Sequence, residues 1–247
     1  SVDTSGWTLA RLTAAGRTDV ALPGNSLPAG GFAVIDAAAL GFEPLDGDRL
    51  VLSDADGTAL DAVVVKKNAR ARHPDATGEW MRPTAATFGA ANAVTLQDAV
   101  VISEIMDHPP SPPLAASAVG GQWVELHNKS AAPVDLTGWE LAGDADFTFP
   151  AGTVLPAGGF LVVAQNPAQL PGVNALGPWT GKLGRGEGRV VLRDAAGNPA
   201  DEVRYFSGGH WPEASDGGGS SLELVDPRAD NSDPQAWAAS DESATAE

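Results

Sequence analysis

The chain has 247 residues, no cysteine and a formal net charge of −17 at pH 7. Without cysteine there can be no disulfide, thiolate catalysis or cysteine-based zinc site, and the acidic charge disfavours duplex DNA and anionic lipid as partners. A hydrophobic fraction of 43% argues against disorder, while 29 Gly and 19 Pro suit short strands joined by tight turns. The composition therefore predicts an all-β protein, long enough for two domains.

The spacing of apolar residues supports that class. Short apolar or β-branched runs alternate with clusters of Pro, Gly, Asp and Asn, at the spacing of a β-sandwich. No run reaches the length of a membrane span. Ser1 opens neither a signal peptide nor an ordinary translation start, so we expect a mature or excised chain.

An internal repeat organises the chain. Three segments recur in the same order: residues 2–9 as 134–141, residues 27–32 (LPAGGF) letter for letter as 155–160, and residues 49–57 as 189–197. The first match aligns Trp7 with Trp139. Three matches in one order indicate a tandem duplication.

The two copies differ at their beginnings. Residues 100–106 and 122–128 predict two strands before the second copy's Gly-Trp motif, whereas the first copy begins where such strands should have ended. We therefore expect two immunoglobulin-like β-sandwich domains in tandem. Their expected bounds are residues 1–97 for an N-terminally incomplete domain, 98–240 for a complete one and 241–247 for an acidic tail.

Residues 54–57 and 194–197 each lie between two strand-like runs, and the Gly that ends each segment suits a hairpin turn. The first segment, Asp-Ala-Asp-Gly, also resembles the opening of a calcium loop. The second copy has Ala196 where Asp56 stands, and no glutamate closes either loop. A hairpin turn is the preferred interpretation, with calcium binding as the alternative.

Further motifs carry a resemblance to a known family. In the second copy they are residues 102–106 (ISEIM), 123–128 (WVELHN), 134–139 (VDLTGW), 147–150 (FTFP), 155–160 (LPAGGF) and 230–237 (DNSDPQAW). These residues resemble the bacterial lamin tail domain, and the first copy is similar from Gly6-Trp7 to its ending at residues 89–92 (GAAN). The resemblance implies an immunoglobulin-like, non-catalytic module of large secreted or surface proteins, at times appended to hydrolases. It implies no catalytic residue. We also expect no metal site and no cofactor.

Alternation in residues 123–127 predicts a strand that covers a core on one side. Val124 and Leu126 share one face, and Trp123, Glu125 and His127 share the other. We also expect Trp7 and Trp139 to be core residues, because large aromatic side chains dominate sandwich cores.

Positive charge concentrates in one segment of this acidic chain. The candidate ligand-binding residues are Lys66, Lys67, Arg70, Arg72 and His73, with Trp80 nearby in the sequence. Basic residues beside an aromatic ring can hold phosphate, sulfate or an acidic polymer. The preferred interpretation is a charged edge that blocks sheet-to-sheet aggregation.

A second polar cluster combines carboxylates with imidazoles, a combination that can bind metal or transfer protons. Its members are Glu104, Asp107, His108, Glu125 and His127. No nucleophile elbow, two-histidine metal helix or phosphate loop accompanies it, so solvated edge or turn residues are the preferred interpretation. None of these polar clusters appears in both copies.

The sequence favours a non-enzymatic structural or interaction module, outside the cell or at its surface. The alternatives are a binding module for acidic polysaccharide or nucleic acid, and an accessory domain of a larger secreted hydrolase. The first copy should have an open sheet edge, because Val34, Leu50 and Leu52 resemble inward residues of a sheet that expects a neighbour. Preceding sequence, a protein partner or self-association could supply strands, or the first copy could be a smaller sandwich packed on the second.

Overall fold

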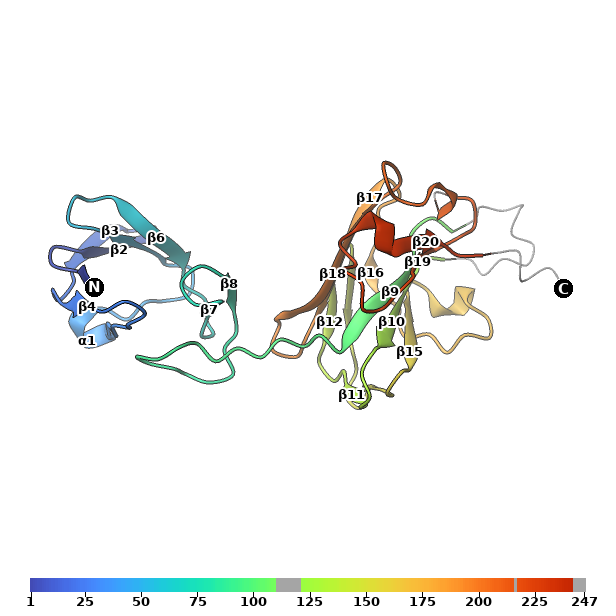
Figure 1. Ribbon diagram of the computed structural model, residues 1–247, viewed down its shortest axis with the longest axis horizontal. Coiled ribbons are helices and arrows are strands. Elements are labelled where there is room, and N and C mark those ends of the chain that lie inside the picture. Colours follow the sequence, from blue (N-terminus) through green and yellow to red (C-terminus); the bar gives the residue numbers. More distant parts are fainter. Residues whose placement is uncertain (110–120, 216, 242–247) are drawn as a thin grey trace. The chain divides into compact units, whose positions relative to one another are not determined.

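The computed structural model describes residues 1–109, 121–215 and 217–241 (Figure 1). It divides into two compact units, Ser1–Thr95 (unit 1) and Leu96–Glu247 (unit 2). Strands dominate both units, which confirms the predicted all-β class. Among the described residues, no helix has the length and apolar character needed to cross a membrane. The predicted acidic tail, residues 241–247, lies outside the described residues except for Asp241.

The described residues of unit 2 form two five-stranded antiparallel sheets. The first has the order β15 (Phe160–Ala164), β10 (Trp123–Asn128), β9 (Val100–Met106), β19 (Leu222–Leu224) and β20 (Trp237–Ala239). The second has the order β16 (Thr180–Gly181), β13 (Ala145–Thr148), β12 (Glu140–Gly143), β17 (Glu187–Arg193) and β18 (Pro199–Phe206). Smaller elements are the pair β11 (Val134–Asp135) and β14 (Val154–Leu155), and the 3-10 turns η1 (Pro167–Gln169), η2 (Glu213–Ser215) and η3 (Pro234–Ala236).

The core of unit 2 draws on both sheets. In β10, Val124 and Leu126 are fully buried while Trp123, Glu125 and His127 are partly exposed, as the alternation predicts. Leu192 of β17, in the other sheet, is also fully buried and belongs to the same hydrophobic cluster. Trp139 lies in this cluster with 4% of its surface exposed, so the prediction that it is a core residue is confirmed.

Unit 1 contains fewer and smaller sheets. A four-stranded sheet has the order β3 (Gly16–Ala21), β2 (Thr8–Thr13), β5 (Arg49–Ser53) and β6 (Ala59–Val64). Two further pairs are β1 (Val2–Asp3) with β4 (Ser26–Leu27), and β7 (Ala71–His73) with β8 (Glu79–Met81). The short helix α1 (Ala37–Leu40) begins after Asp36, whose carboxylate accepts the Ala39 backbone N–H at 2.8 Å.

Burial is shallow in unit 1. Its buried hydrophobic residues are Ala10, Leu40 and Ala71, and Leu50 and Leu52 are partly exposed. The prediction that Trp7 is a core residue is wrong, because this side chain is also partly exposed. Val34 does not lie inward in a sheet: 54% of its surface is exposed.

The predicted hairpin turns are confirmed. Residues 54–57 join β5 to β6, and the Asp54 carboxylate accepts the backbone N–H groups of Asp56 and Thr58 at 3.0 and 2.8 Å. Asp194 accepts the Asn198 N–H at 2.9 Å in the turn between β17 and β18. These carboxylates therefore stabilise the backbone of each turn.

Candidate functional site

The basic segment lies between β6 and β8 of unit 1. Lys66, Lys67 and Arg70 are exposed in the loop that leads into β7. Arg72 lies in β7 directly opposite Trp80 of β8, and its guanidinium carbon lies 4.5 Å from the centroid of the Trp80 ring. The structure therefore brings Arg72 and Trp80 together as a cation–π pair. His73, the next residue of β7, lies opposite Glu79.

Arg72 is already engaged by unit 1 itself. One guanidinium nitrogen, Nη2, lies 2.8 Å from Asp61 Oδ1, and Nη1 donates a hydrogen bond to the Gly78 carbonyl at 2.9 Å. Because Asp61 already pairs with the positive charge of Arg72, that charge is less available to an anionic ligand. The role of this segment in binding a ligand stays a prediction.

The outward face of the first sheet of unit 2 carries a row of carboxylates. Glu125 of β10 lies opposite Glu104 of β9, which in turn lies opposite Glu223 of β19. Burial raises the pKa of Glu125, the hydrogen bond from Ser103 opposes that rise, and the Glu223 charge adds to it. Glu104 accepts a hydrogen bond from the Ser221 hydroxyl. Like charges on neighbouring strands are unfavourable, and these serine contacts offset part of the cost.

The two histidines of the predicted polar cluster have different surroundings. His127 stacks on Phe160 of β15, with ring centroids 4.3 Å apart and an interplanar angle of 9°. Burial lowers the pKa of His127, so its imidazole is an uncharged stacking surface near neutral pH. His108 lies in a turn after β9 beside Gly217, and Asp107 is buried. No group of three potential metal ligands occurs within the described ranges.

A partly buried carboxylate joins the two sheets of unit 2. Asp201 of β18 accepts the backbone N–H of Ile102 in β9 at 2.7 Å. β19 pairs with β9 only at Ile105 and Glu104, so Ile102 lies beyond that ladder and its N–H is available to the carboxylate. Asn231 donates its side-chain amide to both Asp201 oxygens, at 2.9 and 2.8 Å.

Opposing influences act on Asp201. Burial raises its pKa, while the hydrogen bonds from Ile102 and Asn231 lower it. The carboxylate is thus a desolvated acceptor that fixes the position of a core strand.

Unit 1 has a carboxylate at the corresponding place. Leu52 of β5 pairs with Asp61 of β6, as Leu192 of β17 pairs with Asp201 of β18. Both hairpins shift register at the next residue, Ser53 or Arg193. The Asp61 side chain is 46% exposed. Asp61 Oδ1 accepts hydrogen bonds from the Arg72 guanidinium and from the backbone N–H of Ala62.

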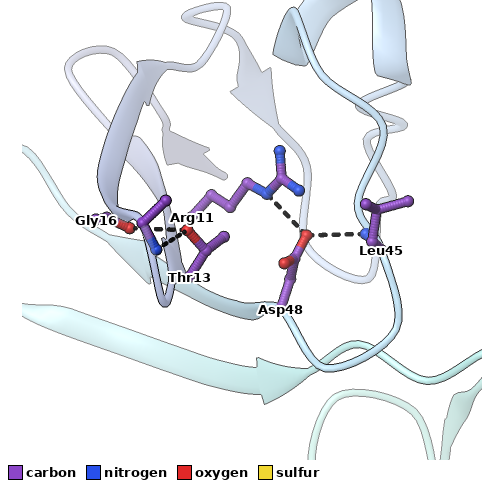
Figure 2. A network of polar contacts seen from close by, with 6 residues as sticks. Arg11, Thr13, Gly16, Leu45 and Asp48 are labelled. Atoms are coloured by element: carbon purple, nitrogen blue, oxygen red, sulfur yellow. Dashed lines mark hydrogen bonds and ion pairs between the residues drawn. The ribbon is translucent and has the colours of Figure 1, made fainter.

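The same face of unit 1 also holds an ion pair. Asp48 Oδ2 accepts a hydrogen bond from Arg11 Nε at 2.7 Å and one from the Leu45 backbone N–H at 2.8 Å (Figure 2). The Leu45 bond and the Arg11 contact hold the pKa of Asp48 below its usual value. Repeat alignment places Gly143 of unit 2 where Arg11 stands.

Sequence reasoning missed three of these residues. Asp61, Asp201 and Phe160 contact groups that are distant in sequence, so no local motif identifies them. An available signal was that Asp61 and Asp201 each stand at the fourth position after the Gly of a hairpin turn.

Comparisons with known proteins bear on unit 2. Residues 93–207 match the family model of the Lamin Tail Domain. A solved structure of a DUF4876 family protein from Bacteroides thetaiotaomicron VPI-5482 is similar at 12% identity and a TM-score of 0.30, over 78% of this chain and 62% of that chain. No curated protein matches the chain. The family match supports the assignment of residues 93–207 to the lamin tail domain family, whose domains are immunoglobulin-like and non-enzymatic.

Proposed function

We propose that this chain is a non-catalytic interaction module that acts outside the cell or at its surface. In this proposal, both units are copies of one lamin-tail-like sandwich, and unit 1 interacts with partners through sheet edges that accept added β-strands. Placement outside the cell rests on the family resemblance alone. The strand pairing of the two units supports the duplication and the strand addition.

Strand pairing supports the duplication. The matching pairs, unit 1 first, are β1–β4 with β11–β14, β2–β3 with β12–β13, β2–β5 with β12–β17, and β5–β6 with β17–β18. The β7–β8 hairpin follows these strands in unit 1 as the β19–β20 hairpin does in unit 2. One sheet of the sandwich is therefore retained in unit 1.

The observation that carries the proposal concerns the sheet that contains β9 and β10 in unit 2. In unit 2, β10 and β9 lie between β15 and β19. In unit 1, residues 32–36, which align with β15, belong to no strand or helix, and β7–β8 is an isolated hairpin. Removing the two central strands from the unit 2 sheet would leave these same two remnants. Exposed remnants of this kind bind partners by β-strand addition.

A binding experiment tests this function. Light scattering after size-exclusion chromatography would follow the full chain with and without a peptide covering residues 100–128. We expect a complex with the peptide, or concentration-dependent self-association of the chain alone. A monomer that ignores the peptide would contradict strand addition.

A turnover screen tests the non-catalytic part. Phosphatase, nuclease, esterase and glycosidase substrates should show no reproducible reaction, because Glu125 lies beside Glu104 while His127 is stacked on Phe160. Turnover that disappears in Glu125→Gln or His127→Ala would refute it.

A second candidate function uses the Arg72–Trp80 pair to bind an acidic glycan or single-stranded nucleic acid. A glycan array, and a nucleic-acid titration at two salt concentrations, would identify it by an affinity that falls with salt and with Trp80→Ala. The Asp61 contact to Arg72 favours strand addition over this alternative. An accessory role in a larger secreted hydrolase is compatible with either function.

A further inference from the structure

We propose that unit 1 pairs with a second copy of this chain along the outer edge of β3, as a two-fold symmetric antiparallel strand pair in which Arg17 of each copy faces Asp19 of the other. This inference rests on the proposed function, because it concerns a sheet edge that accepts an added strand, and it names the occupant of that edge. The edge belongs to the four-stranded sheet and is separate from residues 32–36 and from β7–β8.

The hairpins β2–β3 and β12–β13 have the same register. In unit 1 the Leu22 backbone N–H donates to the Trp7 carbonyl at 2.9 Å. In unit 2 the Phe149 backbone N–H donates to the Trp139 carbonyl, also at 2.9 Å. The third residue before each donor is an aspartate, so the two aspartates have the same place in their strands.

Unit 2 covers the outer edge of this hairpin with a strand of its own. Asp146 of β13 pairs with Thr180 of β16. The β16 strand belongs to the segment 161–188, and unit 1 has the shorter segment 33–48 in its place. Within the described residues, which include all of unit 1, β3 pairs only with β2. The open edge therefore follows from a shorter segment inside the copy.

The open edge of β3 presents its backbone groups in a fixed alternation. Because Leu22 is bound to Trp7, every second residue before it, Thr18 included, points its N–H and C=O groups toward β2. The N–H and C=O groups of Arg17 and Asp19 consequently point away from β2, and both residues are exposed. These two residues can form the hydrogen-bonded pairs of an added antiparallel strand.

The charges on β3 favour a second copy as the occupant. Arg17 contacts Asp19 along the strand at 2.8 Å, and their side chains are 57% and 51% exposed. When Thr18 faces Thr18 across a two-fold axis, each arginine lies opposite the aspartate of the other copy. A register shift by two residues would place arginine opposite arginine or aspartate opposite aspartate, which is unfavourable. The strand is therefore complementary to itself in one register.

This pairing gives a closed dimer. Both copies use the same edge, so two-fold symmetry completes the contact and leaves neither β3 edge open. A single strand pair buries less area than a standard protein interface, so the dissociation constant should lie in the micromolar to millimolar range.

Charge reversal tests the pairing. Sedimentation of the full chain over a range of concentrations should show a monomer–dimer equilibrium. Arg17→Asp and Asp19→Arg should each weaken dimerisation about tenfold, because each places like charges opposite one another at two positions. An equimolar mixture of the two variants should restore the dimer, since two carboxylates then face two guanidinium groups. Glu202→Arg, which reverses an exposed ion-paired charge in unit 2, is the matched control and should dimerise as the wild type does.

A cysteine at the two-fold axis reports the register. The chain has no cysteine, so Thr18→Cys introduces a single thiol. Facing residues of a non-hydrogen-bonded antiparallel pair have Cα atoms about 4.5 Å apart, a separation that a disulfide can span. Mild oxidation should cross-link Thr18→Cys into a covalent dimer. Ala62→Cys, at an exposed position of the opposite edge strand β6, should cross-link far less.

Several outcomes would overturn this inference. They are a chain that stays monomeric, a dimer that is insensitive to both charge reversals or equally sensitive to Glu202→Arg, and equal cross-linking of Ala62→Cys. Binding of the peptide covering residues 100–128 does not involve β3. A chain that binds this peptide without dimerising would therefore leave the proposed function standing, and a chain that does neither would refute both.

Discussion

Units 1 and 2 share a hairpin framework but differ in burial. Leu52 and Leu192 stand at the same place in β5 and β17 and pair with the aspartate of the next strand, yet Leu192 is fully buried and Leu52 is partly exposed. The difference arises because unit 2 has a second five-stranded sheet, whereas outside its four-stranded sheet unit 1 forms only the pairs β1–β4 and β7–β8. Local sequence therefore specifies pairing, and the facing sheet specifies the core.

The largest expected contrast concerns the aligned tryptophans. Trp139→Ala should lower the free energy of unfolding of unit 2 by about 3–5 kcal/mol, because it removes a buried indole and leaves a cavity. Trp7→Ala should cost unit 1 clearly less, since its side chain is partly exposed already. Hydrogen exchange at increasing denaturant concentration, followed separately for the amides of each unit, would measure both changes in the free energy of unfolding. Equal costs would mean that Trp7 has a core environment after all.

The aligned aspartates should differ by a smaller amount. Asp201→Ala should destabilise unit 2 by about 1–3 kcal/mol, because the Ile102 N–H loses its acceptor inside the protein. Asp61→Ala should change the stability of unit 1 by about 0.5 kcal/mol or less, as expected for an exposed ion pair. Denaturant titration of the two variants and the wild type would measure the difference. A large loss in Asp61→Ala would show that unit 1 uses this residue for its own stability.

The smallest expected effect is a difference in pH dependence. The folded-state pKa of Asp201 is raised by burial, so folding binds an extra proton between the unfolded pKa, near 3.8, and the folded pKa. Acidification from pH 6.5 to 4.5 should therefore increase this group's contribution to the stability of unit 2. Asp201→Asn should reduce that increase. An unchanged pH profile in the variant would assign the effect to another group, with Glu125, whose pKa is also raised, as the next to test.

Asp48 in unit 1 should behave in the opposite sense. Its folded pKa is lowered by the Leu45 N–H and Arg11, so its stabilising contribution is complete above the unfolded pKa and disappears as the pH falls through the folded pKa. Between pH 6.5 and 4.5 this group should leave the stability of unit 1 unchanged, and denaturant titration at the two pH values would check it.

Much of the fold could be predicted because its signals are local. The Asp54 and Asp194 turns depend on a carboxylate and a glycine within a few residues, and the alternation in β10 identifies its buried face directly. The partial exposure of Trp7 could not be predicted in this way, because it depends on which segments distant in the sequence pack against the side chain. The basic segment was identified by composition, but its pairing with Asp61 was missed because that contact spans 11 residues.

Under the proposed strand addition, the irregular backbone of residues 32–36 would set the thermodynamics of binding. A segment that becomes a strand only on binding loses conformational entropy at that moment, at about 1–2 kcal/mol per residue. Complex formation should therefore have a favourable enthalpy, an opposing entropy and a negative change in heat capacity, with less affinity for its buried area than a preformed edge would provide. Proline placed within residues 32–36 of unit 1 would remove one backbone N–H from the added ladder, and calorimetry would register the lost enthalpy.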